Sequence, residues 1–334
     1  MMYRPLVAVS DSVFPNLDPA RDVLSQIGAE LQMATSSTPD AIMHVAREAD
    51  ALMVTYANVN GEMIQQMQRC RIISRFGIGV DNVDIPAATT ASIIVTRVPD
   101  YCIDEVSDHT MALLLALVRR IPFANSHVHE GRWEMSAVVP ISRLRESILG
   151  LFGFGRISRL VASKAKAFGM RVISHDPLVS PEIMNRAGVG CVEFSELLRL
   201  SDHISIHAPL RPETNRLFNE DVFRKMKPTA HLINTARGPI VDVPALARAL
   251  DAGHLAGAAL DVMPQEPPYA SPLFGRPNVI LTPHMSFYSV ESLIDLQCKA
   301  AQEVVRVFTG NVPLNAVNPE VLKSHKHSNV LLNR

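Results

Sequence analysis

Residues 148–177 read ILGLFGFGRISRLVASKAKAFGMRVISHDP, and this stretch decides the fold. An apolar run ends at Gly153, Phe154 and Gly155, a helix-period segment follows, and a second apolar run ends just before Asp176. The two glycines permit a tight strand-to-helix turn, whose first helical N–H groups can face an anion. The pattern therefore predicts strand, helix and parallel strand, the opening unit of a doubly wound α/β domain.

The same turn carries most of a dinucleotide-binding fingerprint. The amides of Arg156 and Ile157 would face pyrophosphate oxygens, whereas Ser158 replaces the third glycine and weakens the motif without abolishing it. Asp176 stands 23 residues after Gly153, where the fingerprint places an acid that binds the ribose hydroxyls. Because a carboxylate there repels a 2′-phosphate and no arginine follows it in HDPLVS, the pattern favours NAD over NADP. The turn alone would also suit a flavodoxin-like domain without a cofactor.

Short β-branched runs alternate with helix-period segments along nearly the whole chain, which predicts two parallel sheets. The expected strands of the first series are Leu6–Ser10, Ala51–Tyr56, Ile72–Phe76 and Ile93–Thr96. Those of the second are Leu149–Phe152, Arg171–His175, His203–His207, His231–Asn234, Ala256–Leu260 and Val279–Leu281. Long helix patterns at Glu105–Arg120 and Ser289–Thr309 bridge the two series. We therefore expect two doubly wound Rossmann or flavodoxin-like domains with a cleft between them. Residues 1–103 and 286–334 would bind substrate, and residues 104–285 would bind NAD.

Composition excludes several classes of protein. The 334 residues carry a net charge of −1 without a basic cluster, which argues against nucleic-acid binding. The longest apolar stretch, residues 111–118, is too short to span a bilayer. No secretory signal begins the chain, so a cytoplasmic protein is expected. The four cysteines form no CxxC pair, which argues against a zinc site or a disulfide framework.

Three polar residues follow late apolar runs in a fixed order: Arg237 in INTARGP, Glu266 in ALDVMPQEPP and His284 in ILTPH. An arginine fork can hold a substrate carboxylate and polarise the neighbouring carbonyl. A histidine can exchange a proton near neutral pH, and a carboxylate behind the ring fixes its tautomer. Together they predict redox chemistry on a small 2-oxo or 2-hydroxy acid, although each residue alone would be an ordinary turn residue.

From about Asp50 to Pro319 the chain resembles the D-isomer-specific 2-hydroxyacid dehydrogenases, which include phosphoglycerate dehydrogenases. The matching phrases are RFGIGVDNVD, VPDYCIDEVSDHTMALLLALVRR, GRWEM, PISRLRESILGLFGFGRI, HDP, DHISIHAPLRPETNRLF, KMKPTAHLINTARGPIVD, GAALDVMPQEPP and NVILTPHMSFYS. The resemblance implies that Arg237 binds substrate, that His284 is the acid–base and that Glu266 pairs with it.

Further roles come from the same resemblance. The implied substrate-binding residues are Tyr56, Gly77, Ile78, Gly79 and Phe287. The implied cofactor-lining residues, beside those of the turn, are Thr110, Pro177, His207, Ala208, Pro209, Thr214, Thr235, Ala236, Asp261 and Ser286. Asp261 would face the nicotinamide amide, with a turn cap as the alternative role.

Within the family, VPDYCIDEVSDH and HMSFYSVES resemble the branch of the C-terminal-binding-protein corepressors. That branch offers an alternative function, an NAD(H)-sensing binding module with little turnover. For an enzyme, the expected substrates are D-3-phosphoglycerate, glycerate or hydroxypyruvate, glyoxylate, or an aliphatic or aromatic 2-oxo acid. The family also implies a homodimer to which Trp133 and the helix 105–120 contribute. The tail, residues 324–334, has no strong pattern and is expected to be loosely held or to pack on the first domain.

Overall fold

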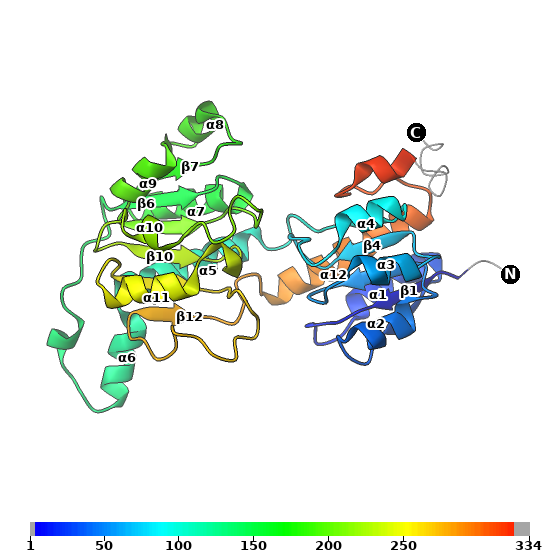
Figure 1. Cartoon of the computed structure of the whole chain (residues 1–334), viewed down its shortest axis with the longest axis horizontal. Helices are drawn as coiled ribbons and strands as arrows, with labels where there is room; N and C mark the ends of the chain where they lie inside the picture. Colours follow the sequence, from blue (N-terminus) through cyan, green and yellow to red (C-terminus); the bar gives the residue numbers. More distant parts are fainter. Residues whose placement is uncertain (1–3, 324–334) are drawn as a thin grey trace. The chain divides into compact units, whose positions relative to one another are not determined.

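The computed structural model describes residues 4–323 and divides them into two compact units (Figure 1). One unit consists of residues 4–101 and 289–323, and the other runs from Cys102 to Tyr288. The expected tail, 324–334, lies outside the described residues. The chain changes unit two residues before and three residues after the boundaries predicted at 103 and 285. Cys102 is the N-cap of a helix of the second unit, and the amide of Ser286 is bonded to Asp261 of that unit, which explains both shifts.

The first unit is built on a five-stranded parallel sheet of order β2-β1-β3-β4-β5. Its strands are β1 (Leu6–Val9), β2 (Glu30–Met33), β3 (Ala51–Val54), β4 (Ile72–Arg75) and β5 (Ile94–Thr96). Its helical segments are α1 (Asp18–Leu24), η1 (Ser25–Ile27), α2 (Pro39–Ala46), α3 (Gly61–Gln66), α4 (Ile85–Thr90), α12 (Val290–Phe308) and η4 (Pro319–Lys323). Helices α1 and α12 pack on each other, and α12 packs on β4. The second of the two helices expected to bridge the series, predicted at Ser289–Thr309, is thus α12, the last large helix of this unit.

The second unit carries a seven-stranded parallel sheet of order β12-β11-β10-β9-β6-β7-β8. Its strands are β6 (Ile148–Phe152), β7 (Arg171–His175), β8 (Gly190–Cys191), β9 (His203–Ile206), β10 (His231–Asn234), β11 (Gly257–Leu260) and β12 (Val279–Leu281). Its helical segments are α5 (Ile103–Val118), α6 (Ile121–His129), η2 (Met135–Val138), α7 (Arg156–Ala167), α8 (Pro181–Arg186), α9 (Phe194–Leu200), α10 (Glu220–Phe223), η3 (Gly238–Ile240) and α11 (Val243–Asp251). The predicted class, two doubly wound parallel sheets, is confirmed.

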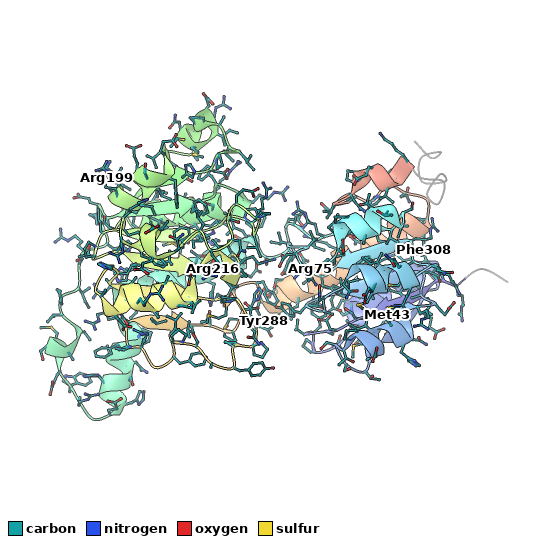
Figure 2. The ribbon with its side chains drawn as sticks, in the orientation of Figure 1. Met43, Arg75, Arg199, Arg216, Tyr288 and Phe308 are labelled. Atoms are coloured by element: carbon teal, nitrogen blue, oxygen red, sulfur yellow. The ribbon has the colours of Figure 1, made fainter. Side chains whose placement is uncertain are left out.

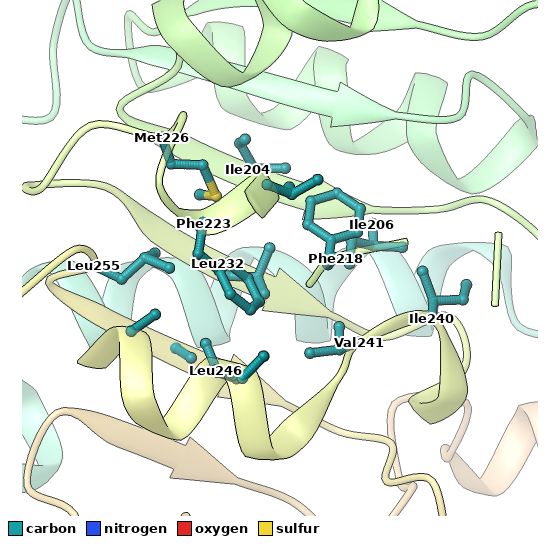
Figure 3. Packing of buried hydrophobic residues seen from close by; sticks show 14 of the residues in the cluster. Ile204, Ile206, Phe218, Phe223, Met226, Leu232, Ile240, Val241, Leu246 and Leu255 are labelled. Carbon is teal, nitrogen blue, oxygen red and sulfur yellow. The ribbon is translucent and has the colours of Figure 1, made fainter. Parts of the chain in front are cut away.

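Alternation along the strands of the second unit explains why helices cover both faces of its sheet. Leu232 of β10 points into a cluster with α9, α10 and α11, which Figure 3 shows from close by. Its neighbour Ile233 joins the opposite cluster, formed with α5, α7 and α8. Because successive side chains of a strand point to opposite faces, one apolar run serves two cores.

In both units an aspartate carboxylate accepts a backbone amide at the start of a central strand. The carboxylate of Asp50, just before β3, accepts the Leu6 N–H at 2.8 Å, where β1 begins. Asp202, just before β9, accepts the Ile148 N–H at 2.8 Å, where β6 begins. Each acid thereby satisfies an amide that its strand ladder leaves open and fixes the register of two neighbouring strands.

Strands β2 and β8 are absent from the sequence expectation. β2 reads ELQM at the sheet edge with three of its four residues exposed, and β8 has two exposed residues. Edge strands with solvated side chains lack the apolar run that marks a central strand. Phe308, labelled in Figure 2, is the last residue of α12. The Arg71 guanidinium lies 4.9 Å from the centre of its ring, a cation–π contact between the residue before β4 and the end of this helix.

Candidate active site

The predicted dinucleotide turn links β6 to α7. Gly153 has φ +96°, and a Cβ there would lie 2.9 Å from the Ala208 nitrogen and from the His207 carbonyl carbon. Only glycine suits both the backbone angle and this approach. A Cβ at Gly155, in contrast, would meet nothing within 4 Å, so the space over the helix start is open. No side chain of the described residues caps α7 and no acid occupies its first turn, as anion binding requires.

Ser158 and Asp176 complete the turn. The buried Ser158 hydroxyl donates to the Gly153 carbonyl at 2.6 Å, so the serine in place of the third glycine is satisfied within the turn itself. Asp176, at the end of β7, accepts the Phe154 N–H at 2.7 Å and the Leu178 N–H at 2.9 Å. Both bonds orient its carboxylate and leave acceptor positions for ribose hydroxyls. The residues present therefore fit a dinucleotide.

Two further predicted cofactor segments lie at the same end of the sheet, where the parallel strands terminate. His207 follows β9, and burial lowers the pKa of its ring to about 4, so this ring is neutral at physiological pH. The Thr214 hydroxyl donates to the Pro209 carbonyl at 2.8 Å and closes the loop that follows. The hydroxyls of Thr110 on α5 and Thr235 after β10 lie 3.0 Å apart, and both side chains are buried.

The loop after β10 presents Arg237. Asn234 fixes this loop by donating to the Arg237 carbonyl at 2.9 Å and accepting the Ala236 N–H at 3.0 Å. The half-buried Arg237 side chain donates to the Ala236 carbonyl at 2.8 Å. A Cβ on the next residue, Gly238, would lie 2.0 Å from the Met263 carbonyl carbon. The arginine loop is therefore in direct backbone contact with the segment that leads to Glu266.

Glu266 and His284 meet across neighbouring strands. The Glu266 Oε2 lies 2.6 Å from the His284 Nδ1, while its Oε1 accepts the Met263 N–H at 2.9 Å. Phe287 packs edge-on against the histidine, with ring centroids 6.0 Å apart. Since β10, β11 and β12 are parallel neighbours, the loops after them share one edge of the sheet. This topology gathers the predicted arginine, glutamate and histidine on one unit.

His284 has φ +49°, an uncommon backbone conformation for a residue other than glycine. Asp261 holds the surrounding turn, because its carbonyl accepts the His284 N–H at 2.8 Å and its carboxylate accepts the amides of Met285 and Ser286 at 2.9 Å. The side chain of Asp261 is 0% exposed. Its turn-capping role, considered above as the alternative, is therefore present.

The predicted substrate residues Tyr56 and Gly77–Gly79 belong to the other unit, where they follow the neighbouring strands β3 and β4. Gly77 has φ +148°, and the Arg75 guanidinium occupies the place of its missing side chain, with Nη1 1.2 Å from where a Cβ would lie. Asp11 accepts the Tyr56 N–H at 2.6 Å and thereby fixes the end of β3.

The sequence predicted residues that would touch ligands, but it missed several that hold the candidate site loops in place. Gly238, His109, Thr282 and Asp11 were not singled out, although each contacts a candidate site loop. The TARGP and TPH phrases contain Gly238 and Thr282 and could have drawn attention to both. Nothing local marks His109, whose contact lies 173 residues away. In the described part of the chain, no three or more His, Cys, Asp or Glu side chains are grouped to hold a metal.

Comparison with known proteins identifies the family. Residues 111–286 match the model of the D-isomer specific 2-hydroxyacid dehydrogenase, NAD binding domain. The chain belongs to this family. The match lies within the second unit, so the predictions of the family and of a nicotinamide dinucleotide cofactor are confirmed. The proposed corepressor branch stays a prediction.

Relatives of several named activities resemble this family member. A glyoxylate reductase of Thermococcus litoralis is 39% identical over 85% of this chain and 88% of its own. A D-3-phosphoglycerate dehydrogenase of Synechocystis is 37% identical over 93% of this chain. A D-lactate dehydrogenase of Aquifex aeolicus, solved with NAD and lactic acid, has a TM-score of 0.86 at 28% identity, covering 94% of this chain and 99% of its own. The chain spans only 56–58% of the length of three of the phosphoglycerate dehydrogenases it matches. Among residues 4–323 there is no helix long and apolar enough to cross a membrane.

Proposed function

We propose that this chain is an NAD-dependent oxidoreductase that interconverts a D-2-hydroxy acid and its 2-oxo acid. The observation that carries the proposal is the 2.6 Å contact between Glu266 Oε2 and His284 Nδ1, beside the loop of Arg237. When bound, the dinucleotide supplies or accepts the hydride. Asp176 at the ribose position supports NAD rather than NADP.

In this proposal the glutamate fixes the tautomer of the histidine. When Nδ1–H of His284 donates a hydrogen bond to this carboxylate, Nε2 is the nitrogen left for proton transfer. The protonated ring gives a proton from Nε2 to the developing alkoxide, and the neutral ring takes it at Nε2 in the reverse direction. The Arg237 fork holds the substrate carboxylate and polarises its carbonyl. We expect the backbone amides of Gly77–Gly79, which belong to the other unit, to bind the substrate carboxylate as well.

The first test is NADH oxidation by the purified protein against glyoxylate, hydroxypyruvate, its 3-phosphate, 4-methyl-2-oxopentanoate and phenylpyruvate. Turnover of one acid supports the proposal. The substituent of the accepted acid, apolar or charged, then indicates whether Phe287 or a cation selects the substrate. The variant His284→Ala should then lose about 10²- to 10⁴-fold in rate with NADH binding intact. Arg237→Ala should chiefly lose kcat/KM for the oxo acid. Tight NADH binding without turnover of any acid would favour the NAD(H)-sensing module instead.

We also infer a homodimer formed through the second unit. Helix α6 and the segment after it stand away from the rest of this unit in Figure 1, and none of the nine α6 residues is buried. Trp133 is 87% exposed and Met135 78% exposed, an apolar surface that a partner subunit would cover. Light scattering should give a dimer for the parent protein, and Trp133→Ser should weaken it. A parent monomer at micromolar concentration would contradict the inference.

A further inference from the structure

A second histidine lies behind the loop of His284. His109, on α5, places its Nε2 3.1 Å from the Thr282 hydroxyl and 3.6 Å from Asp261 Oδ1. The Thr282 hydroxyl lies 2.6 Å from the same Asp261 oxygen. The His109 side chain is 18% exposed. Nothing in the proposed mechanism uses this ring.

The hydrogen positions in this cluster follow from chemistry. An ionised Asp261 can only accept, so the single Thr282 hydroxyl hydrogen belongs to the 2.6 Å bond. The Thr282 oxygen must then accept from His109, which requires a hydrogen on Nε2. His109 therefore donates a hydrogen bond to Thr282, and Thr282 donates one to Asp261.

Asp261 needs this partner because its carboxylate is fully buried. A buried charge is stable only when hydrogen bonds and nearby dipoles replace its hydration. Two backbone amides and the Thr282 hydroxyl supply part of this, and the His109 ring adds a basic group 3.6 Å from Oδ1. The same carboxylate holds the turn in which His284 adopts φ +49°.

We propose that His109 is a positioning residue, which orients Thr282 and Asp261 and thereby holds His284 in its strained turn. This inference rests on the proposed function of His284. Its neighbour Thr110 contacts Thr235, next to the Arg237 loop, so adjacent residues of α5 support both catalytic loops. A strained backbone conformation persists only where the surroundings over-determine it, and His109 is part of that constraint.

Two substitutions separate the hydrogen bond from the space that the ring fills. His109→Gln keeps an N–H donor near the position of Nε2, whereas His109→Leu fills a similar volume without a donor. We expect the leucine variant to lose about tenfold in kcat with at most about a threefold change in the NADH dissociation constant, and the glutamine variant to recover most of the loss. Thr282→Val should lower kcat about as much as His109→Leu. The double variant His109→Leu/Thr282→Val should have a kcat no lower than that of Thr282→Val alone. His44→Leu, at an exposed position on α2 of the other unit, controls for the substitution itself.

A measurement without substrate keeps this inference distinct from the proposed function. Hydrogen exchange of the Met285 and Ser286 amides should be at least about tenfold faster in His109→Leu than in the parent or in His109→Gln. The ring of His109 should also show the Nε2-protonated tautomer by nitrogen NMR above neutral pH. Unchanged exchange in the leucine variant, or an Nδ1-protonated ring, would overturn the positioning role. A parent protein that reduces no oxo acid but shows the expected exchange would refute the function and keep the positioning role.

Discussion

Gly238→Ala gives the sharpest test of how the candidate site is held together. The added Cβ would lie 2.0 Å from the Met263 carbonyl carbon and 2.5 Å from the Pro264 nitrogen. Ordinary contact begins at 3.4 Å, so the two backbones must separate by 3.4 − 2.0 = 1.4 Å along this line. Both neighbours are backbone atoms, and no side-chain rotation relieves the clash.

This displacement would act on the 263–266 segment that carries Glu266. The bond from Met263 N to Glu266 Oε1 ties the glutamate to the same segment, so the 2.6 Å contact with His284 should be lost with it. A misplacement of about 1 Å can cost about 10²-fold in rate. Overpacking should also lower the free energy of unfolding by about 1–3 kcal/mol. We expect kcat for the accepted 2-oxo acid to fall about 10²-fold while NADH binding is retained.

The assay is steady-state NADH oxidation, together with fluorescence titration of NADH and thermal unfolding. Gly190→Ala is the matched control, because a Cβ there meets the Ile173 side chain at 3.3 Å, a contact that this side chain can relieve. A Gly238→Ala protein with kcat within about twofold of the parent would refute the reasoning. It would mean that the glutamate segment moves freely without affecting the site.

Three other predictions use the same unit. Burial lowers the pKa of His203 and of His231 from 6.5 to about 4, so their contribution to stability should be complete above pH 6.5 and be lost as pH falls toward 4, by about 3 kcal/mol for the first of the two rings to be protonated; urea unfolding at pH 7.5 and 5 tests this, and equal stability at both would contradict it. Ser158→Ala should destabilise the protein by about 1–3 kcal/mol, since the buried Gly153 carbonyl loses its 2.6 Å donor; thermal unfolding checks it, and an unchanged Tm counts against the bond. Asp176→Ala should raise KM for NADH and reduce the discrimination against NADPH, and an unaltered ratio of kcat/KM for the two would remove Asp176 from cofactor choice.

Much of the fold could be predicted because the sequence patterns of its strands and helices are local. Strands β7, β10 and β12 have the predicted limits, and the other predicted strands differ by one or two residues at an end. β2 was missed because its residues are mostly solvated at a sheet edge. In the candidate site, the glycine turn and the order of arginine, glutamate and histidine are motifs of the sequence, whereas the hydrogen bond of Ser158 within the turn depends on the folded backbone.

The sequence by itself determined the class of the fold and the family, and it predicted which residues touch a dinucleotide or an oxo acid. Backbone angles of glycine, strand alternation and side-chain chemistry are properties of short segments, so a single chain displays them. Tertiary structure alone decided how those residues are held. Gly238 contacts Met263, and His109 reaches Thr282 across 173 residues, only because parallel strands bring distant loops to one edge of the sheet. Such contacts depend on the packing of whole elements, which no local pattern encodes.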